Sequence, residues 1–185
     1  MAIETEKKYR LDKRSLVELN DRLAKVGAVF SSERFEENYL HRGGILDERG
    51  AVLRIRRVAD KTYLTYKERI PGDSQFKQKI EFETIVSDVD ETEAIIGKLG
   101  YKLSVVYEKH RKVWHLGECE VVLDELPFGR YMEIEGPMDE ILKTEAMLEA
   151  GDLEAEIRGY PRLTMKYGKE VDGVMEARFE KVKRA

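Results

Sequence analysis

Charged residues recur at a spacing of two in several segments whose composition is typical of β-strands. Successive side chains of a strand point to opposite faces, so residues two apart share one face. Repeated acidic and basic groups therefore predict a sheet with one ionic face, which most strongly limits the folds open to this chain. The groups are Glu4, Glu6 and Lys8, Arg54 and Arg56, Thr65 and Lys67, Glu81 and Glu83, Lys109 and Arg111, and Glu133 and Glu135.

Alternating β-branched and aromatic residues, separated by turn residues such as Gly43-Gly44, Pro71-Gly72 and Gly117, predict about eight strands. The predicted strands span residues 3–10, 35–41, 51–58, 62–69, 77–86, 103–115, 118–125 and 130–135. Apolar residues at helical spacing predict amphipathic helices over residues 15–26, 89–99 and 138–148.

Apolar residues occupy the other face of the same strands, for example Leu53 and Ile55 beside Arg54. Helices are expected against this apolar face, so the ionic face must look away from them. We therefore predict an α+β fold, an eight-stranded antiparallel β-barrel tunnel with helices packed on the outside. A charged interior requires water, metal ions or an anionic ligand in the tunnel, because unpaired buried charges are very costly.

Length and composition predict one domain over residues 1–185, with core motifs in residues 3–136 and a C-terminal helical segment at about 138–185. The formal net charge of −4 argues against a general nucleic-acid binder. The single cysteine, Cys119, excludes an internal disulfide. No apolar segment is long enough for a signal peptide or a membrane span, so a cytoplasmic protein without membrane contact is expected.

Several of the basic residues suit a polyanionic ligand. Arginine presents a fork of donors to phosphate oxygens, and lysine presents a compact charge. A triphosphate carries about four negative charges, which a row of such groups can neutralise. The candidates are Arg54, Arg56, Lys67, Lys109 and Arg111.

The order of the charged motifs resembles the CYTH superfamily, also called triphosphate tunnel metalloenzymes. The resemblance covers residues 3–136 and extends less distinctly through residues 160–170. It is carried by Glu4-x-Glu6-x-Lys8, Leu53-Arg54-Ile55-Arg56, Lys67, Glu81-x-Glu83, Lys109-x-Arg111, Asp124 before the turn at Gly129, and Glu133-x-Glu135.

The resemblance implies an enzyme that acts on a small-molecule triphosphate with Mg²⁺ or Mn²⁺, such as tripolyphosphate, ATP or thiamine triphosphate. Glu4, Glu6 and Glu135 are the first choices as metal ligands; Glu81, Glu83, Asp124 and Glu133 are further ligands or outer partners. Substrate binding is expected at Lys8 and the five cations named above. The expected catalytic residues are Glu4, Glu6, Lys8, Lys67 and Arg111.

Three alternatives stay open at this level. The enzyme either hydrolyses a triphosphate, which we rank first, or cyclises ATP to cyclic AMP and pyrophosphate as a class IV adenylyl cyclase does. A non-catalytic polyphosphate-binding barrel is the third reading, although carboxylates beside the cations would repel an anion unless a metal intervenes. Lys8 either contacts the phosphates or separates Glu4 from Glu6, and the chain is compatible with a homodimer.

Overall fold

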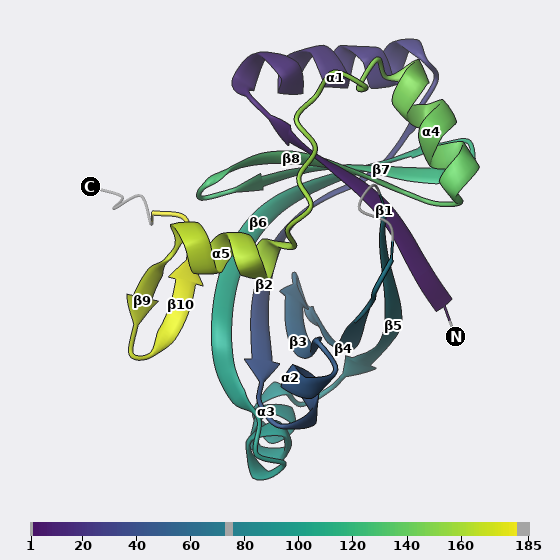
Figure 1. Ribbon diagram of the computed structural model, residues 1–185. Helices are drawn as coiled ribbons and strands as arrows, with labels where there is room; N and C mark the ends of the chain where they lie inside the picture. Colours follow the sequence, from purple (N-terminus) through teal and green to yellow (C-terminus); the bar gives the residue numbers. More distant parts are fainter. Residues whose placement is uncertain (1, 73–75, 181–185) are drawn as a thin grey trace.

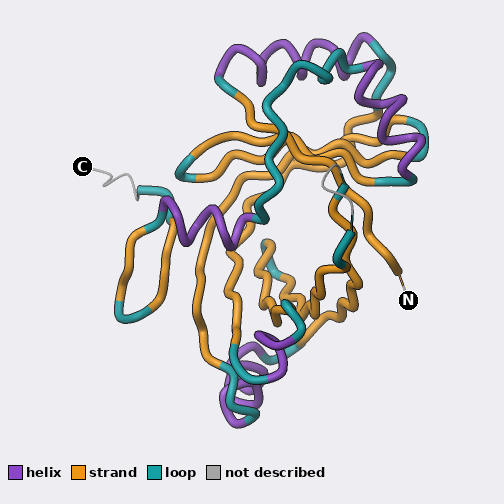
Figure 2. The backbone as a smooth tube through the Cα atoms, viewed as in Figure 1, coloured by secondary structure: helices purple, strands orange, loops and turns teal. Residues whose placement is uncertain are grey.

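The computed structural model describes residues 2–72 and 76–180. Eight strands form a closed barrel, in which neighbouring strands run antiparallel in the order β2-β3-β4-β5-β1-β8-β7-β6 and β6 pairs with β2. Figure 2 shows the ring of strands around the tunnel. The strands are β1 (Ala2–Leu11), β2 (Val29–Arg42), β3 (Ala51–Val58), β4 (Lys61–Ile70), β5 (Lys77–Val86), β6 (Lys102–Leu116), β7 (Cys119–Leu126) and β8 (Gly129–Glu135). The predicted fold class is confirmed.

Helices lie outside this barrel. In the described part of the chain they are α1 (Lys13–Lys25), α2 (Ile45–Glu48), α3 (Val89–Lys98), α4 (Met138–Met147) and α5 (Tyr160–Tyr167). Figure 1 shows α1 and α4 at the top, α2 and α3 at the bottom, and α5 beside β6. Asp12 and Asp88 begin α1 and α3, because each side chain accepts a hydrogen bond from the backbone N–H three residues later. The short helix α2 lies between the predicted strands 35–41 and 51–58, where the sequence predicted a turn at Gly43-Gly44 and no helix. None of the described helices is long and apolar enough to span a bilayer.

The main hydrophobic core lies between the barrel and the helices α1 and α4. Leu23 of α1 and Ile141 of α4 are fully buried, and they share one cluster with Val121 and Ile134 on the outer faces of β7 and β8. The apolar face of these strands therefore points outward, as predicted, and leaves the opposite face for the tunnel.

One wall of the barrel differs from the expectation that helices cover every apolar strand face. Ile3 on β1 and Phe82 on β5 point outward and are 55% and 54% exposed. Strand parity fixed the direction of these side chains, but no element of the described chain packs over them.

The segment after α4 closes a gap in the barrel wall. β5 pairs only with residues 2–6 of β1, whereas β8 pairs with residues 6–11. Beyond Glu6, residues 154–156 replace β5 along β1: Arg10 N–H donates to the Glu154 carbonyl and Glu156 N–H to the Lys8 carbonyl, both at 2.8 Å. Tyr9 and Ala155 form an antiparallel bridge between these two bonds.

The C-terminal region corrects the prediction of a helical segment at 138–185. After α5 the chain forms a hairpin of β9 (Lys169–Val171) and β10 (Val174–Ala177), and β10 pairs in parallel with residues 105–107 of β6. The two strands have three and four residues, too few for a recognisable alternation in the sequence. Residues 181–185 lie outside the described part of the chain.

Candidate functional site

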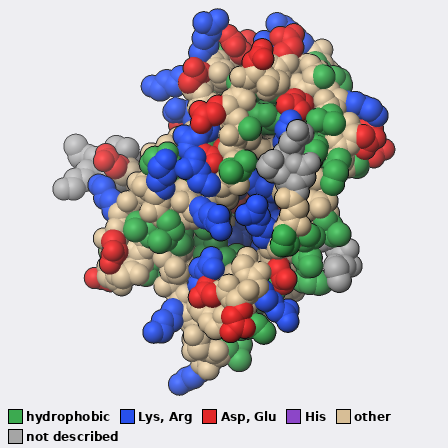
Figure 3. Space-filling view, viewed as in Figure 1, with side chains coloured by type: hydrophobic (Ala, Val, Ile, Leu, Met, Phe, Trp, Pro, Cys, Tyr) green, Lys and Arg blue, Asp and Glu red, His purple; other side chains and the backbone are tan. Residues whose placement is uncertain are grey.

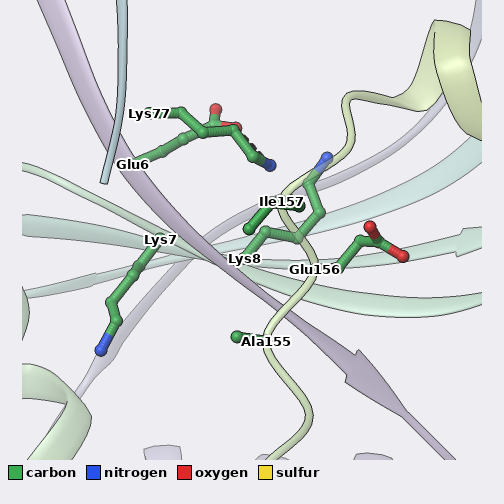
Figure 4. Close-up of a pocket in the computed structure, with 7 residues that line it drawn as sticks. All are labelled: Glu6, Lys7, Lys8, Lys77, Ala155, Glu156 and Ile157. Carbon is green, nitrogen blue, oxygen red and sulfur yellow. Dashed lines mark hydrogen bonds and ion pairs between the residues drawn. The ribbon is translucent and has the colours of Figure 1, made fainter. Parts of the chain in front are cut away.

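The alternation of side chains along each strand places the predicted acidic and basic groups inside the barrel. On β1, Lys8 and Glu6 lie on the tunnel side, and Lys7 points to the opposite side of the strand (Figure 4). Lys7 instead pairs with Glu145 of α4 at 2.6 Å. Glu6 and Lys8 are 2% and 3% exposed, so the walls of the tunnel remove these charges from bulk water.

Three carboxylates converge at one point of the tunnel. One oxygen from each of Glu4, Glu6 and Glu135 lies within 4.8 Å of the others. Glu6 and Glu135 are directly paired across β1 and β8, and Glu4 shares the inner face of β1 with Glu6. Hard divalent cations such as Mg²⁺ and Mn²⁺ prefer oxygen ligands, so this group of residues fits such an ion.

The electrostatics of the carboxylate group also favour a bound cation. Burial, together with the negative charges of Glu133 and Glu4, raises the pKa of Glu135 to about 8. A carboxylic acid with this pKa is largely protonated near neutral pH unless positive charge stabilises its ionised form. A divalent ion at Glu4, Glu6 and Glu135 would supply that charge.

The cations inside the barrel do not form a row apart from the carboxylates; the two kinds of side chain alternate. Each of eight inward-facing cations has a carboxylate oxygen within 4.0 Å. The pairs include Lys8–Glu133 (2.9 Å), Arg54–Glu83 (3.3 Å), Arg56–Glu83 (2.9 Å), Lys67–Glu81 (2.6 Å), Lys77–Glu6 (3.3 Å), Lys79–Glu6 (2.6 Å), Lys109–Asp124 (3.3 Å) and Arg111–Glu133 (2.6 Å).

Arg111, Lys109 and their carboxylate partners form a buried network of alternating charges inside the barrel. Arg111 donates to both oxygens of Asp124, through Nε at 2.7 Å, and also to Glu133 at 2.6 Å. Lys109 lies between Asp124 and Glu36 at 3.3 and 3.4 Å. Burial alone would raise the pKa of Glu133, but the charges of Lys8 and Arg111 hold it well below its usual range.

Tyr160, in the first turn of α5, reaches into this network from one end of the tunnel. The Lys8 ammonium lies 3.6 Å from the centre of the Tyr160 ring, and that of Lys109 lies 5.2 Å away. A cation held over a ring face is attracted by the π electrons. Helix α5 therefore closes part of the tunnel through an aromatic ring placed on two candidate phosphate-binding lysines.

The central cavity has a volume of about 230 Å³ and opens between α5 and the ends of β2, β3 and β4. In Figure 3, Lys and Arg side chains surround the hollow near the centre of this face. Nine of the predicted site residues line the cavity: Glu4, Glu6, Lys8, Arg54, Lys67, Lys109, Arg111, Glu133 and Glu135. Four others do not line it. Glu81, Glu83 and Asp124 contact residues that do, and Arg56 contacts Glu83.

A second cavity of about 290 Å³ adjoins the first on the side of residues 155–157. Glu6, Lys8, Lys77 and Ile157 line both cavities. The ammonium groups of Lys8 and Lys77 each lie 3.4 Å from the carbonyl oxygen of Arg158. The C-terminal segment thus orients these two lysines as well as closing the wall (Figure 4).

Sequence analysis missed several residues of the site. Lys77 and Lys79 share the parity of Glu81 and Glu83 on β5, so the alternation that identified those glutamates could have revealed them. Glu36 is fully buried on β2 and contacts Arg34 at 2.8 Å, but it had no charged partner two residues away in the predicted strand. Tyr160 begins the segment 160–170, over which the resemblance is less distinct, but no sequence pattern assigned a role to its side chain, because that role depends on where α5 packs.

An eight-stranded antiparallel barrel with an ionic, carboxylate-containing interior defines a class of tunnel proteins. The CYTH domain family matches residues 2–160, and the chain belongs to this family. A search of curated proteins found no match.

Solved structures share the fold at low sequence identity. The PH1012 protein from Pyrococcus horikoshii OT3 is 22% identical with a TM-score of 0.75, covering 86% of this chain and 98% of that one. A conserved hypothetical protein from Pyrococcus furiosus is 24% identical with a TM-score of 0.74, covering 86% and 99%. HpAC1 from Hippeastrum, reported to have a dominant triphosphatase activity, is 18% identical with a TM-score of 0.68, covering 93% and 98%.

Proposed function

We propose that this protein is a metal-dependent triphosphatase that hydrolyses tripolyphosphate or a nucleoside or thiamine triphosphate within the tunnel. The observation that carries the proposal is the convergence of Glu4, Glu6 and Glu135 on one point of a cavity that also contains Lys8, Arg54 and Lys67. Such a cavity offers ligands for a hard metal ion and donors for phosphate oxygens side by side.

The pairing of charges supports the requirement for a metal. Because each inner cation already has a carboxylate partner, the walls carry little free positive charge for a triphosphate. A divalent ion bound by the three glutamates would add positive charge and compete with Lys79 for Glu6. The metal and the anion should therefore bind cooperatively.

The residues have distinct proposed roles. Glu4, Glu6 and Glu135 hold Mg²⁺ or Mn²⁺, which when bound polarises a phosphoryl group and lowers the pKa of the attacking water. Lys8, Arg54, Lys67, Lys109 and Arg111 bind phosphate oxygens and neutralise the charge that develops in the transition state. We assign Asp124 and Glu133 to positioning Arg111, because both carboxylates contact its guanidinium.

Cyclisation of ATP uses the same metal and phosphate contacts and is the alternative activity. It requires in addition an oriented ribose hydroxyl, whereas hydrolysis requires only water. For this reason hydrolysis is the preferred reaction. A purely anion-binding barrel would gain nothing from three convergent glutamates.

The test is a product assay with tripolyphosphate, ATP and thiamine triphosphate, each with Mg²⁺ or Mn²⁺. Orthophosphate release that disappears with a chelator supports hydrolysis. Formation of cyclic AMP and pyrophosphate from ATP would show that the reaction is cyclisation instead. At a metal concentration that only half-saturates the wild type, Glu6→Gln should lose most of the activity, while Glu18→Gln on the exposed side of α1 serves as the matched control. Absence of any product from all three substrates would refute the enzymatic proposal.

A further inference from the structure

Three arginines line the open end of the central cavity beyond the carboxylate group. Arg42 lies at the end of β2, Arg69 near the end of β4, and Arg162 in the first turn of α5. They come from separate parts of the sequence, and only the packing of α5 over the barrel brings them to one opening (Figure 1).

Two of these arginines differ from the cations deeper in the tunnel. Arg42 pairs with Asp47 at 2.7 Å. Arg69 and Arg162 form no ion pair with any other residue in ranges 2–72 and 76–180. Their positive charge is therefore not compensated by the described protein.

The position of Arg69 makes the lack of a carboxylate partner among the described residues more informative. It stands directly opposite Lys79 across β4 and β5, and Lys79 stands opposite Glu4 across β5 and β1. Like charges directly opposite each other destabilise a sheet. Lys79 already pairs with Glu6 at 2.6 Å, so an anion bound at Arg69 would meet the one charge of the Arg69–Lys79 pair that is left uncompensated, next to the candidate metal ligands.

The chemistry of the opening favours phosphate over a nucleoside. The side chains of Arg42, Val52, Arg69, Pro161 and Arg162 provide donors and apolar surface, and the Asp47 carboxylate beside them is already paired with Arg42. Phosphate oxygens only accept hydrogen bonds, whereas the hydroxyl groups of a ribose and the amino group of adenine require acceptors. The opening thus suits a chain that continues as phosphate.

The inner and outer cations form a continuous path along β4. Lys67 contacts Glu4 at 3.2 Å, and Arg69 follows on the same face about 7 Å further along the strand. We propose that Arg69 and Arg162 form an outer phosphate subsite for linear polyphosphates longer than three phosphates. This inference rests on the proposed function: water cleaves a terminal phosphoanhydride bond, which gives orthophosphate and a chain shortened by one phosphate.

The proposal is tested by comparing kcat/KM for tripolyphosphate and for a longer linear polyphosphate of uniform length. In the double variant Arg69→Gln/Arg162→Gln, the ratio of the longer to the shorter substrate should fall by roughly tenfold, the effect of about 1.4 kcal/mol. Arg14→Gln, which removes an exposed arginine of α1, is the control and should leave the ratio unchanged. An unchanged ratio in the double variant would overturn the outer subsite, whether kcat/KM stays the same or falls equally for both substrates.

A binding measurement separates this inference from the proposed function. The longer polyphosphate is titrated into the wild-type protein and the double variant in Ca²⁺, with binding followed by calorimetry. Tighter binding to the wild type supports the outer subsite even if no triphosphate is hydrolysed. If the wild type hydrolyses tripolyphosphate but both proteins bind the longer polyphosphate equally tightly, the outer subsite is rejected and the proposed triphosphatase activity still stands.

Discussion

The hydroxyl group of Tyr160 donates a 2.7 Å hydrogen bond to Oδ2 of Asp124. This bond joins the first turn of α5 to the inner face of β7. Asp124 also accepts from Arg111 and Lys109, so the position of the helix and the orientation of two tunnel cations depend on the same carboxylate.

Tyr160→Phe removes this hydrogen bond and keeps the aromatic ring over Lys8. We expect a loss of about 1.5–3 kcal/mol in the free energy of unfolding, the usual contribution of a hydrogen bond to a charged group. Denaturant unfolding measures it. Tyr167→Phe, which removes an exposed 3.3 Å hydrogen bond from Arg10, is the comparison. Equal stabilities of Tyr160→Phe and the wild type would show that the bond to Asp124 contributes nothing.

Glu135 should make the metal-free protein sensitive to pH. Its pKa in the folded protein is raised from 4.5 to about 8, so the stability associated with its protonated form is present below pH 4.5 and is lost as the pH rises through 8. Thermal unfolding in a chelator should show a falling Tm over this window, and Glu135→Gln should flatten that decline. The same slope in both proteins would contradict the assignment.

A divalent ion should reverse the destabilisation caused by Glu135. Mg²⁺ or Mn²⁺ should raise the Tm of the wild-type protein more at pH 8 than at pH 5.5, because the ion binds the ionised carboxylates. In Glu135→Gln the metal-induced rise should be smaller at both pH values.

Glu6→Gln should raise the metal concentration needed for half-maximal activity by removing one charged ligand. The shift is measured by titrating Mn²⁺ against the rate of phosphate release. Glu125→Gln provides a control on β7, since that side chain pairs with Arg130 and does not line either cavity. An unchanged metal requirement in Glu6→Gln would place the metal elsewhere.

Glu36→Gln tests the buried network inside the barrel. The substitution keeps the size of the side chain and removes the negative charge that faces Lys109, Arg56 and Arg34. Removing one partner from a buried ion pair costs about 3–5 kcal/mol, so the free energy of unfolding should fall by a similar amount. Glu33→Gln, an exposed position on the same strand, should change it by less than about 0.5 kcal/mol.

The alternation of residue types by itself determined the barrel and which side chains face its interior. A period of two is a local property of each strand, so Glu4, Glu6, Arg54 and Lys109 could be assigned to the ionic face without knowledge of their partners. The same property would have assigned Lys77 and Lys79, whose charges follow the pattern of β5.

Only the tertiary structure decided how the charges pair and where the tunnel closes. Distances between Lys8 and Glu133, or between Arg111 and Asp124, depend on the stagger of neighbouring strands, which alternation does not specify. The placement of α5, and with it Tyr160 and Arg162, depends on packing and on the bonds of residues 154–156 and β10 to distant strands. These contacts join residues far apart in the sequence, and no local pattern encodes them.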